Sequence, residues 1–356
     1  MVRVAAVGAG SFGRNHLRVY RELETSGQPV ALAAAVEPDA ERARETAKTY
    51  GIPVFASVEE LLRSGPRCDA ASVAVPTVEH HSVAMQLLDA GLDLLVEKPL
   101  AATLGEADEL VALAERKSRI LQPGHLERFN PAVVAIEPKL HRPMFFEAHR
   151  LSVFTPRALD VDVVLDLMIH DLDIVLTFAN SPVREVRAVG LPILSPKVDI
   201  ANVRVEFESG CVANFTASRV STERVRKLRF FEPRQYVSID YARRDLLVIR
   251  LDGSVPPEIA AALEGGKLDP AVLAQLAAGG KGGPGPGLSF AKPAIQAGEP
   301  LRLEIESFLE SVRSRRAPRV TARQGRDALA LALEIQGCMA AHAVRAGLRD
   351  FFEPSV

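Results

Sequence analysis

Short apolar segments alternate with amphipathic helical segments over the first third of the chain. The apolar segments cover residues 2–7, 30–36, 70–75 and 94–96, and the helical patterns between and after them cover residues 14–23, 38–50, 79–90 and 104–116. Fully apolar strands joined by helices are typical of a parallel sheet that is covered on both faces. Residues 1–122 are therefore predicted to form a doubly wound α/β domain.

Much of the remaining chain, residues 123–356, alternates apolar and polar positions with a period of two. The segments with strand character are residues 145–151, 186–189, 203–207, 212–218, 226–231 and 236–239. This alternation predicts an antiparallel sheet with one packed face and one open face. Helices are expected over residues 163–178, 303–313 and 324–345, and the last is expected to pack back on the first domain.

Residues 254–300 carry neither pattern. The Gly/Pro-rich centre of this insertion, residues 279–287, cannot form a packed element, so a flexible surface loop is expected.

Composition agrees with a two-domain globular protein. The chain has 356 residues, of which 47% are hydrophobic and 25% charged. The formal net charge of −2 gives no reason to expect a nucleic-acid or membrane partner, and no stretch approaches the roughly 20 apolar residues of a membrane span. The three cysteines lie far apart, without the spacing of a metal site or a disulfide framework. A cytoplasmic protein without a bound metal is expected.

The loop Gly8-Ala9-Gly10-Ser11-Phe12-Gly13 follows the first predicted strand and opens the first predicted helix. Gly8 permits a tight turn, Gly10 lets the backbone approach a pyrophosphate, and Gly13 lets the helix lie close to the strand. This context predicts a Rossmann domain that binds a dinucleotide. The second domain is predicted to be an α+β domain built on a large, mostly antiparallel open sheet.

Glu37 ends the second predicted strand, a little over 20 residues after Gly13. A carboxylate there accepts hydrogen bonds from the adenosine ribose and repels a 2′-phosphate, which favours NAD over NADP. The alternative is a solvated acid that caps the next helix, and Asp39 is close enough to share either role.

Lys98 lies in the sequence Glu97-Lys98-Pro99, directly after the predicted strand at residues 94–96. The carboxyl ends of parallel strands face the ligand crevice, so Lys98 is a candidate for acid–base work or for holding a substrate hydroxyl. On this residue alone, an exposed lysine at a strand end is the more common explanation.

Asp166 and His170 lie four residues apart in an otherwise apolar helical segment, and Asp173 extends the same face. A histidine is the natural base to take a proton from an alcohol while hydride leaves the carbon. A core histidine with satisfied hydrogen bonds is the alternative.

Three further segments place polar residues near the predicted crevice. They are Pro76-Thr77 with His80 at the end of a strand, residues 124–131 with His125, Arg128 and Asn130 between the domains, and a basic run from Arg219 to Arg234. The basic run suggests anion binding, although the solvated face of a strand explains it equally well.

These motifs occur in the order found in the Gfo/Idh/MocA family, which the chain resembles over nearly its whole length. The motifs are Gly8 to Gly13, Pro76-Thr77 with His80, Glu97-Lys98-Pro99, and Asp166 with His170. The resemblance implies a Rossmann domain, a C-terminal sheet used for homodimer or homotetramer contacts, and Lys98 and His170 near the reacting hydroxyl. It also implies that Asp166 positions the substrate.

Residues 124–131, 166–173 and 299–304 are similar to one branch of this family, the UDP-N-acetylglucosamine 3-dehydrogenases. That branch oxidises the sugar C3 hydroxyl, and an aminotransferase then installs an amine for lipid A biosynthesis. One departure is Ile169, where many family members have glycine before the histidine, so the neighbouring pocket is expected to be shaped differently.

The motifs thus predict an NAD-dependent dehydrogenase, and the resemblance implies that its substrate is a nucleotide sugar. The catalytic residues are predicted to be Lys98, Asp166 and His170. These three residues, together with Arg128 and Asn130, are also predicted to bind the substrate. The cofactor contacts are predicted to be Gly8, Gly10, Ser11, Phe12, Gly13, Glu37, Pro76, Thr77, His80, Glu97 and His125. A dehydrogenase of a free sugar, inositol or dihydrodiol and a non-catalytic NAD-binding regulator are the alternatives.

Overall fold

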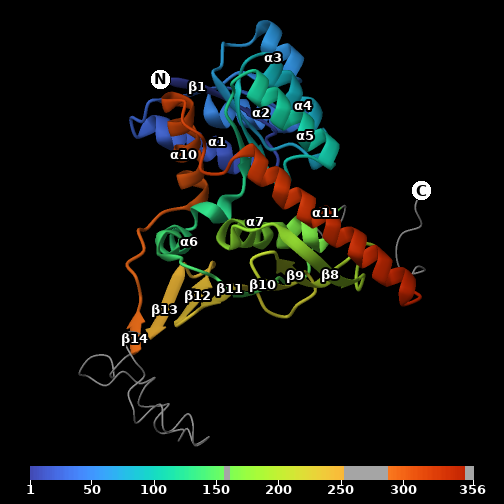
Figure 1. The fold of residues 1–356 in the computed structure, drawn as a ribbon. Coiled ribbons are helices and arrows are strands. Elements are labelled where there is room, and N and C mark those ends of the chain that lie inside the picture. The colour runs from blue at the N-terminus through green and yellow to red at the C-terminus, as the bar shows by residue number, and fades with distance from the viewer. Residues whose placement is uncertain (156–160, 252–287, 349–356) are drawn as a thin grey trace, which may run out of the picture. The chain divides into compact units, whose positions relative to one another are not determined.

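The computed structural model describes residues 1–155, 161–251 and 288–348. The chain divides into two compact units. Unit 1 comprises residues 1–130, 164–174 and 298–337, and unit 2 comprises the described residues among 131–163, 175–297 and 338–356. The domain boundary after residue 122 remains a prediction. Figure 1 labels the helices and several strands of the two units.

Unit 1 contains a six-stranded sheet in which all strands run parallel, as the apolar segments predict. Its strands are β1 (Val2–Val7), β2 (Val30–Val36), β3 (Val54–Phe55), β4 (Ala70–Val73), β5 (Asp93–Glu97) and β6 (Leu121–Gly124), in the order β3-β2-β1-β4-β5-β6. The order reverses between β1 and β4. In such sheets the crevice at this reversal, at the carboxyl ends of the strands, receives the ligand.

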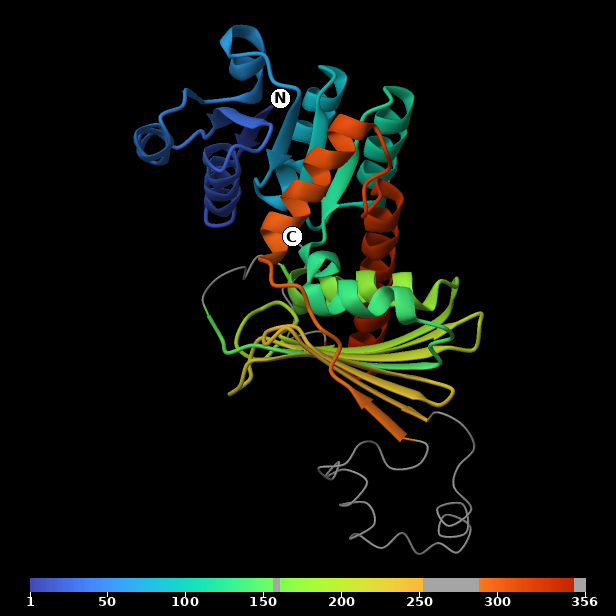
Figure 2. The ribbon, with the colours of Figure 1, turned by 90° about the vertical axis from the view of Figure 1, so that its left-hand side faces the viewer.

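Helices cover both faces of this sheet, so that neighbouring strand residues enter different cores. The helices are α1 (Gly13–Thr25), α2 (Ala40–Tyr50), α3 (Val58–Ser64), α4 (Thr77–Asp89), α5 (Leu104–Arg116), α10 (Pro300–Ser314) and the first part of α11 (Ala322–Arg345). Leu94 and Val96 pack with α4 and α5, whereas Leu95 packs with α1 and α10. Figure 2 shows α10, which follows in the chain long after β6, lying along this sheet.

The helix expected over residues 163–178 is divided in two. Val164–Met168 form a π-helical turn, and α7 spans Ile169–Ala179. A short 3-10 turn, η1 (Leu126–Phe129), follows β6. A π-helical turn contains more residues than an α-helical turn. It therefore rotates the residues that follow it relative to their positions in a regular α-helix.

Unit 2 contains an eight-stranded mixed sheet. Its strands are β7 (Phe145–Leu151), β8 (Val183–Leu191), β9 (Ile200–Phe207), β10 (Val212–Ser218), β11 (Val225–Glu232), β12 (Gln235–Asp240), β13 (Asp245–Leu251) and β14 (Leu288–Ala291), in the order β14-β13-β12-β11-β7-β10-β9-β8. Among the strands described for this sheet, only β7 and β10 pair in parallel. The mostly antiparallel sheet and the parallel Rossmann sheet confirm the predicted fold class.

The period-two pattern of unit 2 separates a packed face from an open one. Phe146, Phe215 and Phe230 are buried on the packed face, where α6 (Pro131–Ile136), followed by the 3-10 turn η2 (Glu137–Lys139), contacts β12 and β13. Strand β14 lies inside the insertion predicted to be a loop over residues 254–300, and residues 254–287 of that insertion lie outside the described residues.

No helix within the described residues combines the length and the apolar character needed to cross a membrane.

Candidate active site

The glycine loop between β1 and α1 meets the steric demands of a dinucleotide site. A side chain on Gly8, whose φ is +90°, would come within 2.6 Å of the Ala74 carbonyl oxygen, and one on Gly13 would come within 1.9 Å of the Gly8 oxygen. A Cβ on Gly10 would instead meet no atom within 4 Å. The backbone at Gly10 is therefore open to a pyrophosphate, and the amide groups that begin α1 offer donors to it.

Glu37 at the end of β2 braces this loop. Its carboxylate accepts hydrogen bonds from the amides of Ala9 at 2.9 Å and Asp39 at 3.0 Å, and from the Arg42 guanidinium at 3.0 Å. Burial opposes ionisation, but the hydrogen bonds from Arg42, Asp39 and Ala9 outweigh it and lower the pKa of Glu37. Asp39 itself caps α2. The contact of Glu37 with the ribose remains a prediction.

His80 of α4 lies behind the turn that follows β5. Its Nδ1 is 2.8 Å from the Pro99 oxygen and its Nε2 is 3.0 Å from the Val75 oxygen, and the residue is 1% exposed. Burial lowers the pKa of His80 despite these two hydrogen bonds. The structure thus makes His80 a support for the chain at Pro99, and Pro76 and Thr77 begin the same helix in more exposed positions.

Lys98 and Asp166 meet in unit 1 although 68 residues separate them. The Lys98 ammonium donates a hydrogen bond of 2.7 Å to the main-chain oxygen of Asp166 and lies 3.7 Å from its carboxylate. The carbonyl that accepts this bond belongs to the π-helical turn, and His170 follows in the first turn of α7. The side chains of Lys98 and Asp166 are 20% and 27% exposed, so both can reach a bound molecule.

Glu97 joins three elements of unit 1. One of its carboxylate oxygens lies 2.9 Å from Nε2 of His16 in α1, which is buried. A side chain on Gly124 of β6 would come within 2.9 Å of the same oxygen, so glycine is required beside Glu97. Neither His16 nor Gly124 was predicted from the sequence as a partner of Glu97. The position of His16, three residues after Gly13 and on the buried face of α1, was the available signal.

The predicted contacts from residues 124–131 are buried in unit 1. His125, Arg128 and Asn130 are 1–2% exposed. The Arg128 guanidinium lies 3.5 Å from the Asp173 carboxylate, and Nδ2 of Asn130 donates to the Glu127 carboxylate at 3.1 Å. These contacts give the segment a structural role, and its contact with cofactor or substrate remains a prediction.

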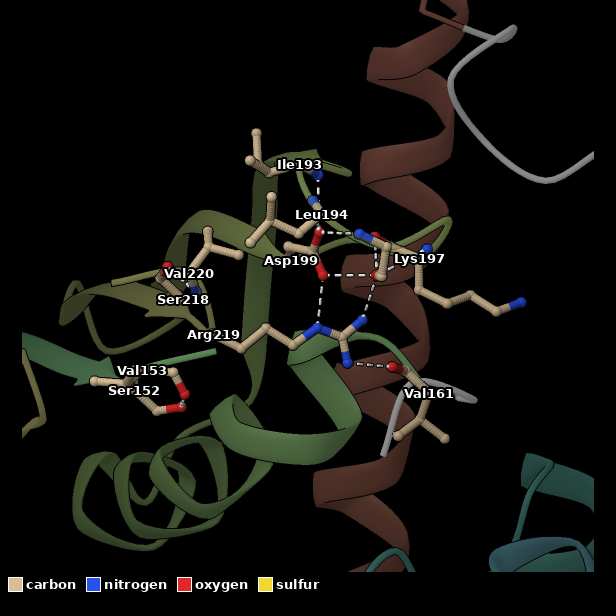
Figure 3. Close-up of polar contacts among 11 residues, drawn as sticks. Ser152, Val153, Val161, Ile193, Leu194, Lys197, Asp199, Ser218, Arg219 and Val220 are labelled. Atoms are coloured by element: carbon tan, nitrogen blue, oxygen red, sulfur yellow. Dashed lines mark hydrogen bonds and ion pairs between the residues drawn. The ribbon is translucent and has the colours of Figure 1, made fainter. Parts of the chain in front are cut away.

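The basic run in unit 2 begins with a buried ion pair, drawn in Figure 3. Nε of Arg219 donates to Asp199 at 2.7 Å, and its terminal nitrogens donate to the Val161 oxygen and the Ser195 hydroxyl. Asp199 also accepts hydrogen bonds from the main chain of residues 193–195. Arg219 is therefore structural. Lys227 of β11 is exposed on the face opposite to the buried Leu228 and Phe230, which fits the alternative of a solvated strand face.

Unit 1 thus combines a dinucleotide loop with the ammonium of Lys98 and the carboxylate of Asp166 beyond the carboxyl end of β5, and His170 follows in α7. A base and a cation close to one hydroxyl group can remove its proton while its carbon is oxidised. Within the described residues, no group of three histidine, cysteine, aspartate or glutamate residues is placed to hold a metal ion.

Comparison with known proteins identifies the two parts of the chain. Residues 2–125 match the oxidoreductase family with an NAD-binding Rossmann fold, and residues 133–234 match the GFO/IDH/MocA C-terminal domain. The chain is 32% identical to the UDP-N-acetylglucosamine 3-dehydrogenase of Acidithiobacillus ferrooxidans over 94% of its own length and 96% of the relative's.

Two further comparisons also identify the chain as similar to sugar and inositol dehydrogenases. The chain is 26% identical to the scyllo-inositol 2-dehydrogenase (NAD(+)) of Bacillus subtilis, over 62% of its own length and 68% of the relative's. A solved structure of UDP-N-acetylglucosamine 3-dehydrogenase from A. ferrooxidans aligns with a TM-score of 0.81 at 31% identity, covering 96% of this chain and 98% of the other. The chain therefore belongs to the Gfo/Idh/MocA family and is an NAD-dependent oxidoreductase.

Proposed function

We propose that this enzyme oxidises a secondary hydroxyl of a nucleotide sugar, converting UDP-N-acetylglucosamine to its 3-keto form. The observation that carries the proposal is the contact of Lys98 with Asp166 in the unit that holds the glycine loop. The similarity to the A. ferrooxidans enzyme over 94% of the chain supports the choice of sugar and of the oxidised carbon. On this proposal the product feeds an amine-installing step of lipid A biosynthesis.

The residues of unit 1 divide the work between binding and proton transfer. Gly8, Gly10 and Gly13 leave room for the pyrophosphate of NAD, which supplies a hydride acceptor when bound. His170 takes the hydroxyl proton as general base. Lys98 holds the hydroxyl oxygen and stabilises the negative charge that develops on it, and Asp166 positions both Lys98 and the sugar.

The residue before His170 bears on sugar choice. Ile169 is fully buried, so its side chain packs into the core. Its effect on the pocket is therefore indirect, through the position of the first turn of α7.

A substrate panel tests the proposal. The protein is incubated with NAD and UDP-N-acetylglucosamine, together with a ketone trap because the oxidation is uphill, and NADH absorbance and product mass are followed. UDP-N-acetylglucosamine should react faster than free N-acetylglucosamine, myo-inositol or scyllo-inositol. Faster turnover of an inositol would favour the alternative suggested by the B. subtilis relative.

We further propose that the enzyme is a cytoplasmic homodimer or homotetramer that associates through the open face of the unit 2 sheet. The three cysteines form no disulfide with one another, which suits a reducing compartment. On the open face, Phe231 contacts the rings of Phe145 and Tyr236 and is 36% exposed. An exposed aromatic cluster of this kind is typical of a protein interface.

A further inference from the structure

A layer of polar side chains is buried between the parallel sheet and helix α1. Ser72 and Gln122 share one row of the sheet, and Glu97 lies on the same face just beyond that row. Tyr20 of α1 lies 2.6 Å from the Ser72 hydroxyl, and His16 of the same helix lies 2.9 Å from Glu97. This polar layer therefore ends at the residue that precedes Lys98.

Glu304 of α10 adds a second carboxyl group to the polar layer. It is 0% exposed, and its main-chain oxygen accepts a 3.4 Å hydrogen bond from Nε2 of Gln122. Among the described residues, neither carboxyl oxygen of Glu304 has a hydrogen-bonding partner, and the same holds for Oε1 of Gln122 and Nδ1 of His16. A charged carboxylate in this place would have no compensating contact, and the cost of burying it would be large.

The groups around Glu304 add to this cost. Burial raises the pKa of Glu304 well above its usual value, and the negative charges of Glu97 and Asp173 raise it further. Tyr20, Glu97 and Asp173 are the titratable groups that interact electrostatically with Glu304. Among the partners of these groups, His16 contacts Glu97. Arg128 pairs with Asp173, and burial keeps Tyr20 neutral by raising its pKa. Glu97 is therefore the other acidic residue of the polar layer that interacts with Glu304.

We propose that Glu304 is a positioning residue of this oxidoreductase, acting as a neutral carboxylic acid that holds Glu97 through internal water. Buried polar atoms that lack a protein partner are normally satisfied by ordered water. Glu97 contacts the helix of the glycine loop through His16 and directly precedes Lys98. By holding Glu97, Glu304 therefore influences both cofactor binding and the position of Lys98 without touching either. This inference rests on the proposed role of Lys98.

A stability measurement tests the protonation state of Glu304. Because its pKa is raised in the folded protein, the buried acid costs nothing below its unfolded pKa, and the fold loses stability as pH rises above that value. Glu304→Gln removes this cost. The gain in Tm over the wild type should grow between pH 4 and pH 8, while Glu310→Gln, an exposed acid on the same helix, should show no such growth. A gain that does not grow with pH would overturn the proposal.

Infrared spectroscopy and cofactor binding complete the test without any sugar substrate. The wild type and Glu310→Gln should show the C=O band of a protonated carboxylic acid at neutral pH, and Glu304→Gln should lack it. NADH affinity, measured by NADH fluorescence, should stay within about twofold in Glu304→Gln and fall about tenfold or more in Glu304→Leu.

The outcomes separate this inference from the proposed substrate. An absent infrared band, or equal NADH affinity in the Gln and Leu variants, would contradict the role of Glu304 even if UDP-N-acetylglucosamine is oxidised. If Glu304→Leu does not fold, the infrared band and the pH-dependent gain in Tm decide the matter. Failure to oxidise the nucleotide sugar would leave all of these measurements unaffected.

Discussion

Lys98 reaches from the carboxyl end of β5 to the main-chain oxygen of Asp166, and His170 follows one turn later in the chain. Each of these side chains alone is compatible with a structural role. The contact between Lys98 and Asp166 indicates a catalytic role, because it brings a cation and a carboxylate to the end of the sheet where dinucleotides bind.

Removing the proposed base or cation should stop the chemistry without removing the cofactor. We expect Lys98→Ala and His170→Asn each to lower kcat by about 10²–10⁴-fold, the usual contribution of general acid–base catalysis. NADH affinity should change little. Lys117→Ala, which removes an exposed lysine paired with Asp89, is the control. Near-normal kcat in either site variant would show that the residue is not catalytic.

Alanine substitutions at two glycines of the loop should affect different properties, namely stability at Gly13 and NADH affinity at Gly10. Gly13→Ala places a Cβ 1.9 Å from the Gly8 oxygen and should cost about 1–3 kcal/mol of unfolding free energy. Gly10→Ala has open space, so stability should be unchanged, while NADH affinity falls at least about tenfold, equivalent to 1.4 kcal/mol. Urea denaturation and NADH fluorescence titration measure the two effects. A Gly10→Ala variant that binds NADH normally would contradict the placement of the pyrophosphate.

Among the elements, local periodicity predicted most strands and helices of the two sheets, together with the glycine loop and the strand end that carries Lys98. It missed β13 and α6, and β14 lies in the segment predicted to be a loop. Contacts between distant segments were not predictable in the same way. Glu304 reaches Gln122 only because α10 returns to the sheet 182 residues later in the chain. The π-helical turn at residues 164–168 was also missed, because an apolar segment with a few polar residues has the same pattern in either helix type.

The Asp199–Arg219 pair should stabilise unit 2 in a pH-dependent way. Burial opposes ionisation of Asp199, but hydrogen bonds from Ser195 and Arg219 outweigh it and hold its pKa well below the usual value. A lowered pKa contributes stability above the unfolded value, and this stability is lost as pH falls through the folded one. Asp199→Asn should therefore cost about 3–5 kcal/mol at neutral pH and progressively less in acid.

Urea denaturation at several pH values measures this loss. Glu185→Gln, which removes an exposed partner of Arg187, is the control and should cost less than about 1 kcal/mol. A small, pH-independent effect of Asp199→Asn would contradict the assignment of this pair as a structural anchor.

At the scale of the whole molecule, the open face of the unit 2 sheet is the surface through which copies of the chain are proposed to associate. Phe231→Glu places a charge within the cluster formed with Phe145 and Tyr236. We expect the wild type to sediment as a dimer or tetramer and the variant to dissociate, because a buried unpaired charge opposes association. Sedimentation velocity measures both. An unchanged assembly in the variant would place the interface elsewhere.

The transfer of deuterium from the sugar to the cofactor is the most direct test of the proposed reaction. UDP-N-acetylglucosamine labelled with deuterium at C3 is incubated with the enzyme, NAD and a ketone trap, and the reduced cofactor is analysed by mass spectrometry. We expect the cofactor to gain one deuterium atom, transferred as deuteride from C3, and the trapped sugar to be a 3-ketone. Turnover that yields unlabelled NADH, or no turnover where a free polyol reacts, would contradict the proposed reaction.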